Sequence, residues 1–150
     1  MSSTLSIDAS SASLLQALAE FRYQLRSFLQ FSEQAATEHG IRPRQHQLLL
    51  QIAGIQEGRT ATINYLAERL ALRQNSVVEL ADRSEAEGLV RRREDPEDRR
   101  RVVLTVTPKG MRMLDALSDS HARELDEFGP QLIRGLDRIK TARNAARSRR

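Results

Sequence analysis

Arginine supplies almost all of the positive charge of this 150-residue chain, and it is concentrated in the middle and at the C-terminal end. Of the 24 basic residues only Lys109 and Lys140 are lysines. Residues 59–112 carry a net charge of +3 and residues 138–150 a net charge of +6, although the whole chain has only +4. A guanidinium group matches phosphate and guanine better than an ammonium group does. This distribution makes nucleic acid a candidate partner.

Residue patterns for catalysis or metal binding are missing from the sequence. It contains no cysteine, which excludes disulfides, thiolate nucleophiles and cysteine-ligated zinc. Glycine-rich phosphate loops, nucleophile elbows and metallohydrolase signatures are absent too, so we expect neither an enzyme nor a cofactor. The candidate metal ligands are Glu38, His39, His46, Asp119, His121 and Glu124. No two of them have the paired spacing that is typical of zinc sites. No metal site is therefore predicted, and His121 is interpreted as an interface histidine.

The hydropathy of the chain gives no sign of a membrane or export segment. The mean hydropathy is −0.53, and 39% of the residues are hydrophobic. No stretch reaches the roughly 18 uninterrupted apolar residues that a membrane span needs, and the first 13 residues lack the order of a secretory signal. We expect a soluble, cytoplasmic protein without a membrane partner.

Helices are predicted on both sides of the basic middle segment. Apolar residues recur every three or four positions from Ser11 to Glu38, which indicates one long helix. This helix is too long for a core of this size, so part of its stripe is expected to pack on a second subunit. A second helix is predicted to begin at Pro43 and to end at Gly58. After Thr107-Pro108 one helix is expected up to a break at Gly129-Pro130, and a last helix follows that break.

The middle segment has the pattern of a helix-turn-helix followed by a hairpin. Two short helices are predicted, one after Thr62 as its N-cap and one that follows a short break at residues 71–75 and is stopped by Gly88. Residues 89–94 and 102–106 have the composition of two strands. The run between them, 95–101, begins with Asp-Pro and contains only charged residues besides the proline. We therefore expect a charged β-hairpin, or wing.

The stretch from Thr62 to Gly110 resembles the winged helix-turn-helix of the MarR family of bacterial transcription regulators. The most specific piece is EGLVRRREDPEDRRRVVLTVTPKG, in which the Gly-Leu-Val exit from the second helix, the Asp-x-Arg wing and the start of the next helix share one register. The resemblance implies a mainly α fold with a small β-hairpin wing, one long N-terminal helix and two C-terminal helices. It also implies a homodimer. The expected regions are dimerisation and support helices at 1–58, a DNA-binding lobe at 59–110, and dimerisation helices with a basic tail at 111–150.

In such a fold the second short helix enters the major groove of DNA with its first residues against the bases. Glutamine and asparagine can pair with adenine, valine can contact a thymine methyl group, and glutamate can accept from cytosine. The candidate residues of this helix are Arg73, Gln74, Asn75, Ser76, Val78, Glu79 and Arg83. Thr62 and Asn64, at the start of the preceding helix, are expected to hold phosphates.

The resemblance also assigns roles to the wing. Asp98 and Arg100 occupy the Asp-x-Arg positions, so Arg100 is expected to reach the minor groove and Asp98 to brace an arginine. Arg99 and Arg101 are expected to contact phosphates. Two residues depart from the family pattern: Ser84 replaces a large aliphatic residue, and Glu79 stands where a basic or small polar residue is commoner.

An effector pocket follows from the resemblance alone. Family members commonly bind small, often aromatic and anionic compounds between the dimerisation helices and the DNA-binding lobe. The candidate lining residues are Phe21, Arg22, Tyr23, Arg26, Phe31 and His46. The expected function is a homodimeric repressor that binds double-stranded DNA at a palindromic operator and is released by an effector. The alternatives are a zinc-responsive regulator of the same fold and a winged-helix module that binds proteins.

Overall fold

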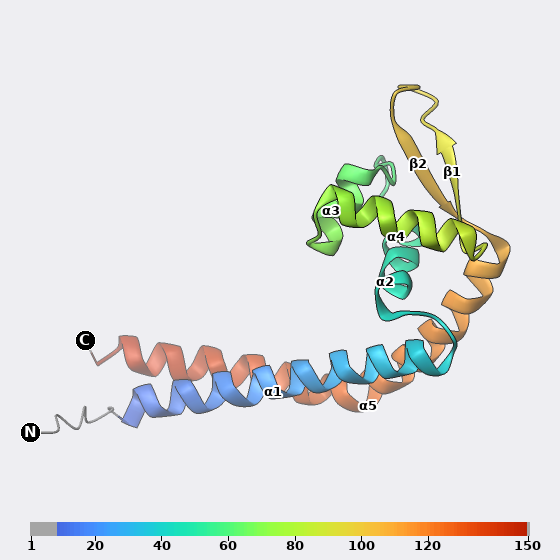
Figure 1. The fold of residues 1–150 in the computed structure, drawn as a ribbon. Helices are drawn as coiled ribbons and strands as arrows, with labels where there is room; N and C mark the ends of the chain where they lie inside the picture. Colours follow the sequence, from blue (N-terminus) through green and yellow to red (C-terminus); the bar gives the residue numbers. More distant parts are fainter. Residues whose placement is uncertain (1–8, 150) are drawn as a thin grey trace, which may run out of the picture. The chain divides into compact units, whose positions relative to one another are not determined.

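The computed structural model describes residues 9–149, and Figure 1 shows its five helices and one β-hairpin. Residues 1–8 and Arg150, the last residue of the basic tail, lie outside the described residues. The fold is mainly helical, and its two strands form an antiparallel sheet, as predicted. The elements are α1 (Ala9–Glu38), α2 (Pro43–Ala53), α3 (Ile63–Leu70), α4 (Gln74–Ala86), β1 (Val90–Glu94), β2 (Val102–Val106) and α5 (Pro108–Arg147).

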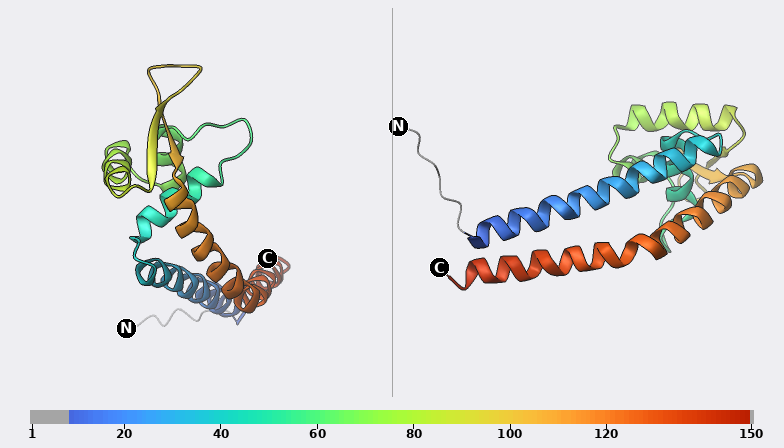
Figure 2. Two further views of the ribbon diagram at one scale, coloured as in Figure 1. Left: turned by 90° about the vertical axis from the view of Figure 1, so that its right-hand side faces the viewer. Right: turned by 90° about the horizontal axis from the view of Figure 1, so that it is seen from below.

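The chain divides into two compact units, which we describe one at a time. The first, the helical unit, consists of residues 9–32 of α1 and residues 121–149, most of which belong to α5. In this unit the two helices run antiparallel, side by side (Figures 1 and 2). The buried Gly135 permits this close approach, because a Cβ atom there would lie 3.2 Å from the Phe21 ring.

The helical unit differs from the prediction at Gly129-Pro130, where α5 continues without a break. Proline lacks one backbone hydrogen bond and crowds the preceding turn, at a cost of about 3 kcal/mol in a helix interior. Packing on both sides of Pro130 offsets this cost, because Phe128 and Leu132 are half-buried and Gly135 and Ala142 are buried. The expected two C-terminal helices are therefore one, and the basic segment is helical as far as Arg147.

The second unit, the winged lobe, contains residues 33–120 and has α2 at its centre. Helix α2 contacts α3, α4 and β2. Leu48 and Leu49 of α2, Leu66 of α3, Val77 of α4 and Leu104 of β2 are all fully buried. Helix α2 ends at Ala53, earlier than the predicted Gly58, because the backbone leaves the helical conformation at Gly54, which has a φ of −91° and a ψ of 25°. The chain then loops to Thr62.

The wing pairs Val90 with Val106 and Glu94 with Val102. The extended residues before α3 join its edge, because Thr62 forms a bridge with Val103 and the Leu104 N–H donates to the Ala61 carbonyl at 3.0 Å. Both predicted caps are confirmed. The Thr62 hydroxyl accepts from the Tyr65 N–H at 3.2 Å, and the Thr107 hydroxyl accepts from the Gly110 N–H at 3.1 Å.

Ser84 occupies the inner face of α4 beside Val77 and Ala81. Its side chain is fully buried, and the hydroxyl oxygen has no hydrogen-bond partner among the described residues. A buried hydroxyl without a partner costs about 1–3 kcal/mol.

We therefore expect Ser84→Ala to raise the free energy of unfolding by about 1 kcal/mol, measured by urea denaturation. Exposed Ser118→Ala of α5 serves as the control, and a destabilised Ser84→Ala would contradict the expectation.

Candidate nucleic-acid interface

The winged lobe contains a helix-turn-helix formed by α3 and α4. Helix α3 buries Tyr65, Leu66 and Ala67. The turn to α4 is tight because Ala71 adopts a left-handed conformation with a φ of 53°. Helix α4 buries only its inner face, so the opposite face is free to meet a partner. The geometry is that of a helix-turn-helix whose second helix is presented to solvent.

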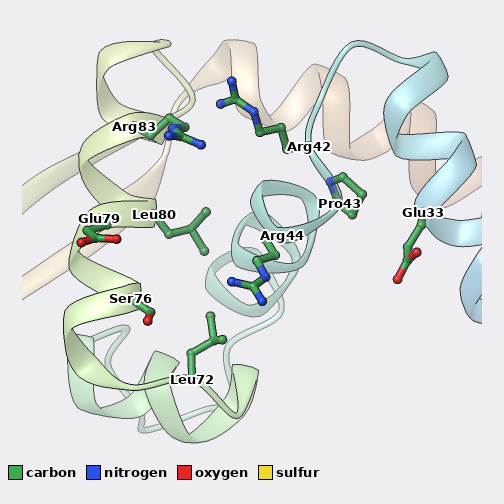
Figure 3. A pocket seen from close by; sticks show the side chains of 9 residues that line it. All are labelled: Glu33, Arg42, Pro43, Arg44, Leu72, Ser76, Glu79, Leu80 and Arg83. Carbon is green, nitrogen blue, oxygen red and sulfur yellow. The ribbon is translucent and has the colours of Figure 1, made fainter.

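The candidate base-reading residues of α4 do not all share one surface. Gln74, Asn75 and Val78 are exposed at the start of the helix, and Arg73 is exposed just before it. Ser76, Glu79 and Arg83 instead line a groove beside α4, shown in Figure 3. Of the two candidate phosphate-binding residues, Asn64 is exposed and the Thr62 hydroxyl already accepts the capping hydrogen bond.

The groove lies between α4 and the start of α2 and has a volume of about 530 Å³. Figure 3 shows Arg42, the residue before α2, and Arg44 of α2 on one side, and Glu79, Leu80 and Arg83 of α4 on the other. Leu72 and Pro43 supply apolar surface, and Glu33 of α1 completes the lining. Three arginines against two glutamates make its lining net positive.

The loop of the wing, residues 95–101, is organised by two aspartates. Asp95 is buried, and its carboxylate accepts from the Glu97 N–H at 3.0 Å. Asp98 accepts from the Arg100 N–H at 3.0 Å and forms ion pairs with Arg100 (3.4 Å) and Arg101 (3.6 Å). The Arg100 side chain is nevertheless 94% exposed, and Arg99 is exposed as well. The loop therefore projects arginines into solvent from a fixed backbone.

The sequence analysis missed Arg92 of β1, which joins the wing to α4. Its guanidinium forms ion pairs with Asp82 and with Glu85, the latter at 3.5 Å, and its backbone N–H donates to Glu85 at 3.1 Å. Strand alternation was the available signal, because Arg92 lies two residues after the buried Val90 and so on the same strand face. The exposed Arg91 and Arg93 lie on the opposite face.

A second missed residue, Glu87, joins three helices. Its carboxylate accepts from Arg42 at 3.2 Å and from the buried Gln45 at 2.9 Å. Gln45 belongs to α2, and Arg42 is the residue before it begins. The Glu87 carbonyl accepts from the Lys109 ammonium group of α5 at 2.9 Å. These contacts hold the C-terminal end of α4 against α2 and α5, and the Lys109 contact satisfies the Glu87 carbonyl. No sequence motif marks this junction.

The candidate effector residues lie in both units. In the helical unit Phe21 and Phe31 are half-buried, and Arg22, Tyr23 and Arg26 are exposed. In the winged lobe His46 is buried. None of these six residues lines the groove beside α4, and the predicted pocket stays a prediction.

The candidate metal ligands do not gather. Within residues 9–149, no three histidine or acidic side chains lie close enough together to hold a metal ion. The His121 ring forms T-shaped contacts with the Phe28 and Phe31 rings, with centroids 6.1 and 5.7 Å away, and its Nε2 atom is 2.6 Å from the Ser32 hydroxyl. Among residues 9–149, no helix is both long and apolar enough to cross a membrane.

Known proteins share both the sequence pattern and the fold. Residues 39–101 match the MarR family. The chain is 30% identical over 112 residues to the HTH-type transcriptional regulator YkoM of Bacillus subtilis (strain 168), covering 71% of this chain and 70% of YkoM. It is also 30% identical over 114 residues to a putative transcriptional regulatory protein for the hcr operon of Thauera aromatica, covering 74% of this chain but only 65% of that relative.

Two solved structures have the same fold. The MarR family transcription regulator SP03579 matches with a TM-score of 0.72 and 20% identity, over 92% of each chain. A point variant of Staphylococcus aureus MepR, bound to an oligodeoxyribonucleotide, matches with a TM-score of 0.58 and 23% identity, over 85% of this chain and 93% of that one. The fold and site are those of a winged helix-turn-helix protein. The chain belongs to the MarR family, a family of DNA-binding transcriptional regulators.

Proposed function

We propose that the chain binds double-stranded DNA sequence-specifically through α4 and the wing and regulates transcription. The observation that carries this proposal is the wing tip, where Asp98 braces Arg100 while the Arg100 side chain stays 94% exposed. A solvent-exposed guanidinium on a fixed backbone suits the narrow and negative minor groove. The DNA-bound MepR variant, which has the same fold, supports the proposal.

The residues divide by role. Gln74, Asn75 and Val78 read bases in the major groove, because they are exposed on the first turns of α4. Arg73, Asn64, Arg99 and Arg101 contact phosphates, and the Thr62 hydroxyl can donate to a phosphate while it caps α3. Ser76, Glu79 and Arg83 contribute through the groove side of α4. Glu79 is thus set apart from the base-reading residues.

Fluorescence anisotropy tests this function directly. The full chain is titrated against a duplex from its own upstream region and against a shuffled duplex. We expect preferential binding to the first, and an affinity that falls by orders of magnitude between about 50 and 200 mM salt as phosphate contacts are screened. Equal binding to both duplexes, or none, would contradict sequence-specific regulation. An affinity that does not change with salt concentration would favour the alternative, a winged-helix module that binds proteins.

Arg100→Ala should weaken DNA binding by about 1–3 kcal/mol, roughly 5- to 150-fold, because it removes the minor-groove contact. The same titration measures the loss. Arg112→Ala, which removes another exposed arginine, from α5, is the matched control and should bind nearly as wild type. Unchanged binding by Arg100→Ala would exclude its assigned role.

We further propose that the protein is a homodimer and that it represses transcription from a palindromic operator. The helical unit supports the dimer, because its large apolar side chains are not all covered: Leu29 is 52% exposed and Ile133 is 63% exposed. Two-fold symmetry then requires half-sites about one helical turn, or roughly 10 base pairs, apart. A promoter–reporter assay in cells that lack the protein tests repression, since reporter output should rise.

Release by a small anionic or aromatic effector completes the proposal. Support comes from the net positive groove, whose wall includes α4 itself. A ligand there releases DNA only if it binds the DNA-incompetent arrangement more tightly. Adding benzoate to the preformed DNA complex should lower the anisotropy, and no fall at millimolar benzoate would argue against a carboxylate effector of this kind.

A further inference from the structure

Helix α4 has the wrong charge for a helix that enters the DNA groove. Between Gln74 and Ala86 it carries three acidic residues, Glu79, Asp82 and Glu85, and one basic residue, Arg83. Glu79 belongs to the groove beside α4, whereas Asp82 and Glu85 are partly exposed away from it, at 57% and 41%. Like charges repel over the Debye length, about 8 Å at physiological salt. Phosphates on either side of an inserted helix lie within that range.

Arg92 is placed to offset half of this outward charge. Its guanidinium contacts both carboxylates, and its backbone N–H holds the second oxygen of Glu85. The Arg92 side chain is only 31% exposed, so its donors are turned toward α4 rather than toward solvent. Arg91, its neighbour along β1, is exposed on the other face of the strand.

Resting on the proposed DNA binding, we infer that Arg92 is a positioning residue that offsets half of the outward negative charge of α4 and fixes β1, and therefore the wing, against that helix. Two carboxylates held by one guanidinium gain both charge compensation and a fixed geometry. Arg92 therefore acts on DNA affinity through Asp82 and Glu85, without a phosphate contact of its own.

The inference predicts a rescue that a direct phosphate contact would not show. Arg92→Gln leaves two carboxylates uncompensated beside the DNA and is expected to weaken binding about tenfold or more. The triple variant Asp82→Asn/Glu85→Gln/Arg92→Gln has no charge left to cancel, and its amide groups can still bond to one another. It should bind within about threefold of wild type. Arg91→Gln removes the same charge from the opposite strand face and should have a smaller effect than Arg92→Gln.

The experiment is an anisotropy titration of these three variants and the wild type on the same duplex at one salt concentration, with circular dichroism to verify folding. Rescue in the triple variant supports the inference. A triple variant as weak as Arg92→Gln, or an Arg92→Gln affinity equal to that of wild type or of Arg91→Gln, would overturn it. If Arg92→Gln unfolds, the DNA affinity of the triple variant is compared with that of the wild type, and a value within about threefold supports the inference. Wild-type protein that binds no duplex would overturn the proposed DNA binding itself. Wild-type protein that binds, with variants that fail the expectations above, would overturn only the role of Arg92.

Discussion

Replacing Gly110 with alanine is expected to lower the free energy of unfolding by about 3 kcal/mol or more, because the new methyl group has no room. Its Cβ atom would lie 2.4 Å from the Leu89 carbonyl oxygen and 2.7 Å from Cγ1 of Val106. The Leu89 oxygen cannot retreat freely, since it accepts from the Thr107 N–H at 3.0 Å and Leu89 is buried. The substitution therefore separates the first turn of α5 from the hairpin.

Thermal unfolding at a fixed protein concentration measures this loss. For a chain of this size we expect the Tm to fall by roughly 10 °C. Gly129→Ala is the matched control on the same helix, because nothing lies within 4 Å of its Cβ position. Alanine at that helical site should stabilise the protein by about 0.5–1 kcal/mol. A Tm of Gly110→Ala equal to that of the wild type would contradict the expectation, because it would show that the contact between α5 and the hairpin adjusts to the extra methyl group.

Ile133→Glu should convert the proposed dimer to monomer. The Ile133 side chain is 63% exposed within the helical unit, so the change costs the single chain little. At a two-fold interface it buries two carboxylates, one from each subunit, without partners. Burial of an unpaired charge costs several kcal/mol, and the dissociation constant should therefore rise by ~100-fold or more.

Sedimentation velocity over a range of protein concentrations checks this result. Gln56→Glu, which adds the same charge in the exposed loop after α2, should sediment as the wild type. Circular dichroism shows whether the Ile133→Glu chain keeps its helices when alone. An unchanged sedimentation coefficient would remove Ile133 from the interface.

Local chemistry made most of the winged lobe predictable. Thr62 and Thr107 are caps whose hydroxyls satisfy the first N–H groups of a helix, and caps act over only a few residues. The charged wing loop was equally readable, because Asp-Pro and the charges around it exclude a buried element. The family resemblance rests on the same local patterns, which explains why the sequence alone indicated the family.

Residues whose partners are distant in sequence were not predictable in the same way. Pro130 was interpreted as a helix break because its local cost is clear, whereas the packing that offsets it comes from α1. Arg92 finds Asp82 and Glu85 only when β1 folds back on α4, and Glu79 turns toward the groove only when α2 packs beside it. These outcomes depend on tertiary contacts, which override local preference.

The junction at Glu87 has a consequence for covalent regulation. Lys109 is the sole lysine among residues 33–120, so acylation, which neutralises lysine, has no target on the arginine-rich wing. Its ammonium group donates instead to the Glu87 carbonyl at the negative end of the α4 dipole. Acetylation of Lys109 would remove that cation and leave one of its three N–H donors. A lysine acetyltransferase would then weaken the contact between α5 and the C-terminal end of α4, while the charges proposed to face phosphates stayed unchanged.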